Sequence, residues 1–413
     1  MKKLLVIGYV WPEPNSSAAG SRMLQILELF QQEKYQLTYA SPALETEHMV
    51  NLASLGIDKI NIELNDSSFD RFVEQLNPDI VLFDRFMMEE QFSWRVEEQC
   101  PSAMRILETS DLHCLRYARQ QALKTHGNIS APDYINDIAL REVASILRCD
   151  LSLMISDYEI EILKNIYHVD ETLLFHLPFM YEALDQEHHL KKFPGYEDRK
   201  DFVTIGNFRH EPNWDSVLYL KREIWPLISA RLKDAEMHIY GAYPPRKATQ
   251  LHNPKERFYV KGWAEDVTAT LSQYRLCLAP LRFGAGIKGK LADAMICGTP
   301  SITTPVGAEA MHGEYEWAGE ITETSEAFTE AAVELYADKK KWEHDQLNGI
   351  MIINKLFNKQ IHQRRFIESL KQGLENLNES RKKNFTGLML KHHYLKSTKY
   401  MSQWIEEKNK RIT

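Results

Sequence analysis

The sequence has few cysteines, and none is placed in a pair that would favour a metal site. The five cysteines are odd in number and widely spaced, with no Cys-x-x-Cys pair. This excludes the usual zinc-binding and disulfide-rich classes of protein. We therefore expect a reducing, cytoplasmic location and no zinc site. No metal-ligand cluster stands out elsewhere in the sequence, and we expect no metal or other cofactor.

Long apolar runs are also absent. The longest, Leu4–Trp11, has eight residues, whereas a membrane-spanning helix needs about 20. Lys2 and Lys3 precede this run as in a signal peptide, but Pro12 and Pro14 follow it closely. A first β-strand is the better interpretation, and we expect no transmembrane segment.

No strong excess of one charge marks the chain as a whole. Its 413 residues carry 50 basic and 58 acidic side chains, a net charge of -8, and 44% are hydrophobic. This composition is that of an ordinary globular protein and excludes disordered and collagen-like chains. The charge is uneven, because residues 381–413 hold nine basic and two acidic residues. A basic tail on an acidic body favours an anionic partner.

Short apolar strands alternate with helical patterns along most of the chain. This alternation predicts a parallel sheet that is covered on both faces. Strands are expected in the first half at KKLLVIGY, QLTYA, KINIEL, DIVLF, AMRIL and LSLMIS, and in the second at DFVTIG, EMHIYG, RFYVKG, RLCLAPL and PSITT. The spacing Ser156-x-x-Glu159 predicts a capping box at a helix start.

The alternation stops once and then begins again, which predicts two domains of the same kind. We expect an α/β domain at 1–180, a polar linker at 181–200, a second α/β domain at 201–340 and a helical extension at 341–413. Ligands of doubly wound sheets bind at the carboxyl ends of the strands. A cleft between the two domains is therefore the expected site.

The most informative segment is RLCLAPLRFGAGIKGKLADAMICGTPSITTPVGAEAM, residues 275–311. A strand leads into a turn with three glycines, Gly284, Gly286 and Gly289, and then into a helix. Glycine lets the backbone approach a ligand closely, and the amides of a helix start attract anions. With Lys288 and Lys290, this pattern predicts a phosphate or diphosphate site. A plain strand-to-helix turn with solvated lysines is the alternative.

Two further interpretations of this segment stay open. Gly284 to Lys290 matches most of a P-loop, but Leu291 stands where a P-loop has the serine or threonine that holds magnesium. Asp293 is the second point. It could accept hydrogen bonds from ribose hydroxyls, or it could simply pair with Lys290 on the helix surface.

This segment resembles the second domain of retaining GT-B glycosyltransferases of family four. The supporting blocks VTIGNFRHEPNWDSVLYLKREIWPLI, EMHIYG and RFYVKGWAEDV precede it in the family's order. The resemblance covers about residues 201–340 closely and the first half more loosely. It implies two Rossmann-like domains facing a cleft. It also implies transfer of a sugar from a nucleoside diphosphate to an acceptor hydroxyl, with retention of configuration and no metal.

The resemblance also implies donor-binding residues. Arg209, Lys288 and Lys290 would contact the diphosphate, with Lys290 stabilising the leaving group. Gly284 and Gly286 would shape the loop, Gly262 and Trp263 would face the nucleobase largely through the backbone, and Asp293 would hold the ribose. The family usually has Glu at the position of Asp293, and the Glu that it often has beside the Gly-rich turn is absent here.

On the acceptor side, the resemblance places Gly20, Ser21 and Arg22 near the donor phosphate; a merely flexible loop is the alternative. Asp111 and His113 follow a strand, where the family often has a His-Asp pair. Asp111 could bind a sugar or acceptor hydroxyl and His113 could move a proton. Alternatively, Ser110 or Asp111 only caps the next helix.

Two other functions remain as alternatives to sugar transfer. One is a further GT-B activity such as a nucleotide-sugar epimerase, and the other is a scaffold that binds nucleotide sugars without turnover. The acceptor could be a glycan, a lipid-linked intermediate or, through the basic tail, RNA. We expect the last helices to pack on the first domain, as in related enzymes. A peripheral position at the membrane is the alternative.

Overall fold

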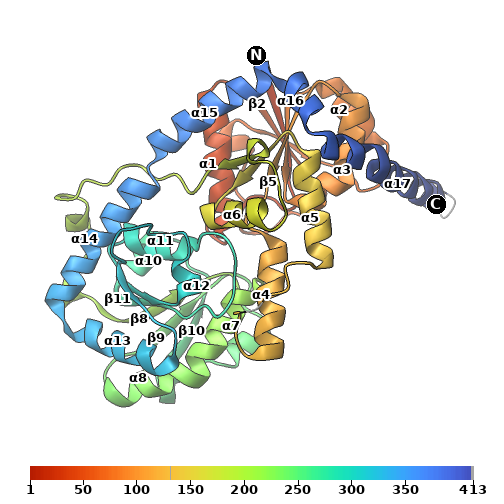
Figure 1. Ribbon diagram of the computed structural model, residues 1–413. Coiled ribbons are helices and arrows are strands. Elements are labelled where there is room, and N and C mark those ends of the chain that lie inside the picture. The colour runs from red at the N-terminus through yellow and green to blue at the C-terminus, as the bar shows by residue number, and fades with distance from the viewer. Residues whose placement is uncertain (131, 411–413) are drawn as a thin grey trace.

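The first domain of the computed structural model, which describes residues 1–130 and 132–410, is built on a seven-stranded parallel sheet (Figure 1). Its strand order is β3-β2-β1-β4-β5-β6-β7. The strands are β1 Lys3–Ile7, β2 Gln36–Ser41, β3 Asp58–Asn61, β4 Ile80–Asp84, β5 Met104–Glu108, β6 Leu151–Met154 and β7 Leu174–His176. All six strands expected in this half are present, whereas β7, a three-residue edge strand, was not predicted.

Both faces of this sheet are buried, as the apolar strands predict. In β1, Leu5 and Ile7 enter one apolar core while Leu4 and Val6 enter the core on the opposite face, because successive side chains of a strand alternate. The helices of this domain are α1 Ala18–Gln32, α2 Ser68–Leu76, α3 Phe86–Gln99, α4 His113–His126, α5 Asp137–Arg148 and α6 Asp157–Asn165.

The second domain repeats the design with six parallel strands in the order β10-β9-β8-β11-β12-β13. The strands are β8 Lys200–Ile205, β9 Met237–Tyr240, β10 Phe258–Gly262, β11 Tyr274–Ala279, β12 Ser301–Thr303 and β13 Gly319–Ile321. Its helices are α7 Glu211–Tyr219, α8 Trp225–Arg231, α9 Arg246–Thr249, α10 Val267–Leu271, α11 Gly289–Ile296, α12 Pro305–Ala308 and α13 Ser325–Ala337. Only the short edge strand β13 was not predicted.

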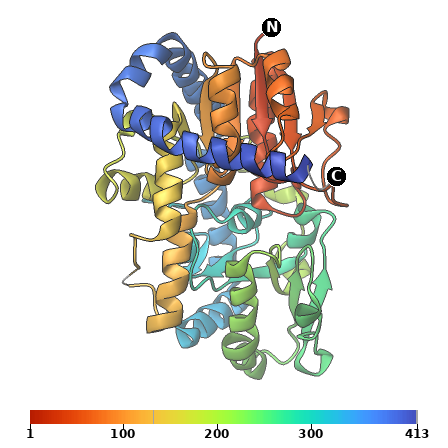
Figure 2. The same cartoon turned by 90° about the vertical axis from the view of Figure 1, so that its right-hand side faces the viewer.

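The C-terminal helices divide between the two domains, so the expected extension at 341–413 is not one unit. α14 (Lys339–Leu356) packs on the second domain, with Ile352 and Ile353 in the same apolar core as Leu291. The helices that follow, α15 Lys359–Glu375, α16 Leu377–Lys383 and α17 Phe385–Lys410, lie on the first domain (Figure 2). Residues 411–413 of the expected extension lie outside the described residues.

The chain passes between the domains at two neighbouring points. Tyr181 donates its backbone N–H to Phe357 O and accepts from Lys359 N–H, both at 2.8 Å. The expected linker at 181–200 starts here and contains only two short 3₁₀ turns before β8 begins. The two crossing segments therefore form a single narrow connection. No helix among the described residues has the length and apolar character that a membrane span needs.

Candidate functional site: the cleft between the domains

A cavity of about 660 Å³ lies between the two domains, a volume typical of small-molecule sites. The first domain lines it with the loop after β1, residues 9–17, and with the ends of β4 and β5. The second domain contributes the segments after β8, β9 and β11. These are carboxyl ends of parallel strands in both domains, which is the edge where the sequence predicts a ligand.

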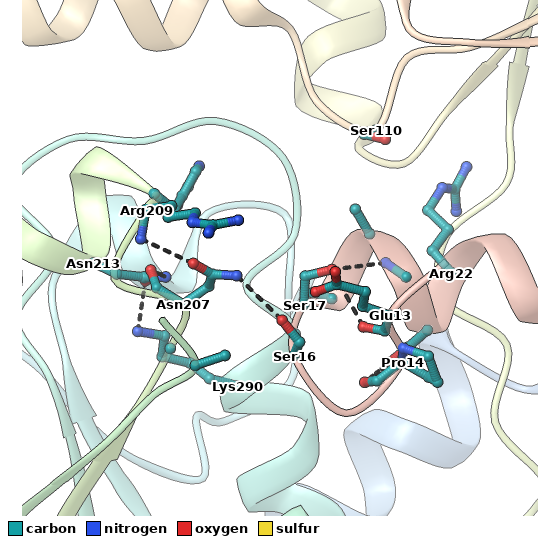
Figure 3. A pocket seen from close by; sticks show the side chains of 18 of the residues that line it. Glu13, Pro14, Ser16, Ser17, Arg22, Ser110, Asn207, Arg209, Asn213 and Lys290 are labelled. Carbon is teal, nitrogen blue, oxygen red and sulfur yellow. Dashed lines mark hydrogen bonds between the residues drawn. The ribbon is translucent and has the colours of Figure 1, made fainter. Parts of the chain in front are cut away.

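One wall of the cavity carries a chain of hydrogen bonds that ends on a lysine (Figure 3). Lys290 Nζ donates to Asn213 Oδ1 at 2.8 Å, and Asn213 Nδ2 donates to the carbonyl of Asn207 at 3.1 Å. Asn207 Nδ2 then reaches Ser16 Oγ of the first domain at 3.2 Å. Because the amide oxygen of Asn213 carries no formal charge, the ammonium of Lys290 keeps its charge available for an anion.

Burial sets the protonation of the two ionisable groups predicted on helix α11. It lowers the pKa of Lys290 to about 8 and raises the pKa of Asp293 to about 7. The nearby Cys277 thiol opposes the shift of Lys290, and Lys290 Nζ donates to Asn213 Oδ1 and not to Asp293. The interpretation of Asp293 as a simple partner of Lys290 is therefore wrong. Both side chains line the cavity.

Arg209, the third predicted phosphate contact from the second domain, lies at the cavity mouth. Its guanidinium carbon is 3.7 Å from the ring centre of Tyr243, and its backbone N–H donates to Asn207 Oδ1 at 2.8 Å. Tyr243 in turn donates its hydroxyl to Glu13 Oε1 of the first domain at 2.8 Å. Arg209 is thus exposed but oriented by an aromatic ring.

Lys288, although adjacent in sequence, is used differently from Lys290. Its side chain is only 8% exposed, and Nζ donates to the carbonyl of Gly286 at 2.6 Å. Burial lowers its pKa to about 8, although the neighbouring Glu309 and Glu159 oppose that shift. Lys288 supports the Gly-rich loop and also lines the cavity, and its contact with a phosphate stays a prediction.

Gly286 lies in close contact with the first domain. Its φ is +64°, and a Cβ at this position would approach Asp111 Cβ to 2.8 Å. Its backbone N–H donates to Glu159 Oε1 at 2.8 Å, and the same oxygen accepts from Leu112 N–H at 2.9 Å. Only glycine meets both the backbone and the space requirement here. Gly286 shapes the loop and is not among the residues that line the cavity.

These bonds correct the predicted capping box. Helix α6 does begin after Ser156, but no side-chain capping bond forms there. The carboxylate of Glu159 is instead directed across the domain boundary to Gly286. Burial raises the pKa of Glu159 to about 8, and the neighbouring charge of Asp111 adds to the shift.

A second contact joins the same loop to the first domain. Arg119 on α4 donates to Glu309 Oε1 at 2.8 Å and Oε2 at 2.6 Å, and also to the carbonyl of Gly284 at 2.9 Å. Arg119 is 5% exposed. Glu309, which the sequence analysis did not select, follows α12. A buried bidentate ion pair therefore spans the two domains.

Asp111 and His113 lie together at the end of β5, as predicted. His113 Nε2 is 3.4 Å from Asp111 Oδ1, and Arg116 pairs with the other oxygen. Burial alone would raise the pKa of Asp111, but Arg116 and the nearby histidines outweigh it and hold that pKa well below its usual range. Burial lowers the pKa of His113 to about 3, with Arg116 and Arg85 adding to the shift although Asp111 opposes it.

The alternative that Ser110 or Asp111 only caps a helix is wrong. Helix α4 begins at His113, and its first amides are accepted by carboxylates from other elements. Glu142 accepts from His113 N–H at 3.0 Å and from the amide of the next residue at 2.8 Å. The side chain of Asp111 is therefore free of a capping role and faces the cavity.

Gly20, Ser21 and Arg22 line the cavity, but each is held by its own domain. Gly20 lies against the backbone of Glu13, where a Cβ would meet the carbonyl oxygen at 2.3 Å. Ser21 Oγ donates to Pro14 O at 2.8 Å. Arg22 is 1% exposed and bonds Glu108 and the carbonyl of Leu177. Its guanidinium is therefore engaged within the first domain, and its place near a donor phosphate stays a prediction.

Trp263 is the last of the predicted donor-site residues that line the cavity. Its indole N–H donates to Asn15 O at 2.9 Å, and its ring stacks on His48 with centroids 4.4 Å apart. Both partners belong to the first domain. Gly262, with φ +83°, turns the chain just before it and is not among the lining residues. Trp263 is thus a contact between domains as well as a wall of the site.

The sequence analysis missed the two asparagines and the interdomain pair. Asn207 and Asn213 lie in the stretch GNFRHEPN directly after strand β8, a position that could have been identified from the same strand-end argument. Arg119 and Glu309 carry no local signal. Among the described residues, no group of three or more His, Cys, Asp or Glu side chains is placed to hold a metal ion.

The comparison with family models decides the identity of the second domain. Residues 199–338 match the model described as glycosyl transferases group 1. Residues 199–338 thus form a domain of the glycosyl transferases group 1 type. The match replaces the P-loop interpretation of the Gly-rich segment. No curated protein matches the sequence.

Solved structures show that the chain has the GT-B fold over about nine tenths of its length. HepE of Anabaena, in complex with UDP and glucose, has a TM-score of 0.67 at 11% identity, over 90% of this chain and 100% of that one. Sucrose-phosphate synthase of Thermosynechococcus elongatus has a TM-score of 0.65 at 14% identity, over 90% and 99%. TarM of S. aureus has a TM-score of 0.56 at 11% identity. The similarity covers 73% of the present chain but only 57% of TarM.

Proposed function

We propose that this protein transfers a sugar from a UDP-sugar to an acceptor hydroxyl, with retention of the anomeric configuration. The observation that carries the proposal is Lys290 of α11, whose ammonium donates to the uncharged amide oxygen of Asn213 in a cavity between two Rossmann-like domains. Crystals of similar proteins contained UDP or UDP-glucose, which supports UDP as the nucleotide.

The donor would lie on the wall of the second domain. Lys290 and Arg209 would bind the diphosphate, and Asp293 would accept hydrogen bonds from the ribose hydroxyls. As the bond between sugar and phosphate lengthens, negative charge grows on the leaving diphosphate. Two cations and the start of α11 would stabilise that charge, and such preorganised electrostatics is commonly the largest catalytic contribution.

The acceptor would approach from the first domain, where Asp111 lies. Because its carboxylate is ionised at neutral pH, it would accept a hydrogen bond from an acceptor or sugar hydroxyl. His113 is neutral at that pH because burial holds its pKa near 3, so it would accept or donate a hydrogen bond without carrying a charge. The sequence analysis suggests that His113 moves a proton; we propose the more specific role of a neutral hydrogen-bond partner.

Turnover of the donor tests the proposal. Purified protein is incubated with UDP-glucose and with other UDP-sugars, and UDP release and sugar products are measured with and without candidate acceptors. We expect slow UDP release without an acceptor and no release by Lys290→Ala. A new sugar nucleotide formed from the donor alone would favour an epimerase. Tight UDP binding with no turnover of any sugar nucleotide would favour a scaffold.

We further propose a lipid-linked acceptor at an anionic membrane surface, with helix α17 as the contact. Phe385, Met389, Tyr400 and Trp404 recur at helical spacing and are exposed, and α17 packs its other face on α3 and α5. Aromatic and basic side chains on one helix face favour the membrane interface. Flotation with phosphatidylglycerol vesicles, but not with phosphatidylcholine vesicles, is the expected result; binding of RNA without vesicle binding would overturn it.

A further inference from the structure

The Gly-rich donor loop of the second domain is held by side chains of the first. Arg119 of α4 donates to the carbonyl of Gly284, and Glu159 of α6 accepts from the amide of Gly286. The two bonds lie on either side of the turn, at 2.9 and 2.8 Å. Because Arg119 and Glu159 both belong to the first domain, the loop keeps these bonds only while the two domains lie together.

The ion pair between Arg119 and Glu309 holds this arrangement in place. It is bidentate, with both bonds below 3 Å, and the Glu309 side chain is 15% exposed. The planar guanidinium therefore fixes two elements of the second domain at once, the donor loop at Gly284 and the residue after α12. Such bidentate pairs provide geometric specificity as well as attraction.

The flanks of the loop are fixed by Phe283 and Ile287, which are buried, whereas its glycines have no such anchor. Gly284 and Gly286 have no side chains, and the support from its own domain includes the bond from Lys288 Nζ to Gly286 O. Glycine has more backbone freedom than any other residue. A loop of this kind is expected to sample several conformations once the first domain moves away.

We propose that Arg119 and Glu309 are positioning residues that couple closure of the domains to the shape of the donor loop. This inference rests on the proposed function and concerns how its donor site becomes competent. The diphosphate contacts Arg209 and Lys290 belong to the second domain alone, so UDP can bind before closure. Transfer requires the sugar to be held as well, and that requires the ordered loop between Gly284 and Gly286.

The coupling predicts separate effects on binding and on turnover. Arg119→Ala is expected to lower kcat for UDP release from UDP-glucose by about tenfold or more, since small misplacements of reacting groups have effects of that size. The Kd for UDP, measured by calorimetry, is expected to change by less than about threefold. Arg119→Lys, which keeps the charge but loses the bidentate geometry, should recover only part of kcat.

The matched control is Arg231→Ala. Arg231 also forms a bidentate pair, with Glu330, but both residues lie in the second domain and are exposed. We expect kcat and the Kd for UDP to stay at wild-type values in this variant. A loss of kcat equal to that of Arg119→Ala would show that the effect has nothing to do with the domain boundary.

A double-mutant cycle distinguishes the interaction between Arg119 and Glu309 from the separate contribution of each residue. If the two residues act as a unit, Arg119→Ala/Glu309→Ala should lose no more kcat than Arg119→Ala alone. Additive losses would overturn the proposal, as would a normal kcat in Arg119→Ala or an equal loss of UDP affinity. The same double-mutant cycle, measured on the free energy of thermal unfolding, gives the interaction energy of the interdomain pair without any substrate. Failure of the wild type to bind UDP would instead overturn the proposed function.

Discussion

Lys290 is the residue whose chemistry most directly defines the donor site. In the free protein burial lowers its pKa to about 8, and a bound diphosphate would raise that pKa by attraction. The complex therefore holds more protons than the free protein above pH 8. UDP affinity should fall as pH rises through about 8, by up to tenfold per pH unit. Calorimetry at pH 7 to 9.5 checks this, and a flat profile would show that Lys290 does not carry the charge.

Arg85 is a residue held in a conformation that arginine rarely adopts. At the end of β4, with φ 72° and ψ 156°, it occupies a region that only glycine enters readily, at a strain of about 1–3 kcal/mol. It lies over the ring of Tyr9 and lines the cavity. Such strain is commonly retained where a side chain has a function.

Arg85→Gly removes both the strain and the guanidinium. We expect the free energy of unfolding to rise by about 1 kcal/mol, which chemical denaturation would detect. We also expect turnover to fall, because the acceptor wall loses a cation. A stabilised variant with full turnover would show that Arg85 has no part in function, and a destabilised variant would show that its contacts outweigh the strain.

At the scale of elements, both the sequence and the structure give a reason for glycine in the Gly-rich turn, but the two reasons differ. The sequence suggests close approach of a ligand to Gly286, whereas the structure shows close approach of the other domain, at Asp111. Lys288 and Lys290 also show that the sequence pattern does not reveal which contacts a side chain makes. Lys288 lies just before α11 and its ammonium bonds the loop backbone, whereas Lys290 lies in the first turn of the helix and its ammonium bonds Asn213. Both side chains line the cavity.

Gly286→Ala tests this contact between elements. A Cβ would meet Asp111 Cβ at 2.8 Å, in addition to the strain of a positive φ. Gly127→Ala is the control, because Gly127 has φ +75° and no atom within 4 Å of the added Cβ. We expect a loss of about 1 kcal/mol for the control, a larger loss for Gly286→Ala, and loss of turnover only in the latter. Equal losses with retained turnover would contradict a tight interdomain contact.

At the scale of the molecule, the arrangement of strands follows from the sequence and the joining of the domains does not. Buried parallel strands are continuous apolar runs, so eleven of thirteen were predicted. The two that were missed, β7 and β13, are short edge strands whose residues are only partly buried. Arg119 and Glu309 are 190 positions apart. Their pairing depends on how two finished domains meet, which no local spacing records.

The same reason explains the C-terminal helices. Their amphipathic pattern predicts helices but not the domain on which each one packs. The chain returns to the first domain beside Tyr181, so α14 and α15 cover different domains although they are neighbours in sequence. Two chain segments thus cross side by side between the domains, a connection that suits a hinge.

Thermal unfolding of the wild type and of Lys290→Ala with and without UDP is the most direct test of the central claim, which is a donor site on the second domain's wall of the cleft. Lys124→Ala, an exposed change on α4, is the control. At 100 times its Kd, UDP should stabilise the wild type and the control by about 2.7 kcal/mol and leave Lys290→Ala nearly unchanged. Equal stabilisation of all three proteins, or of none, would contradict the account.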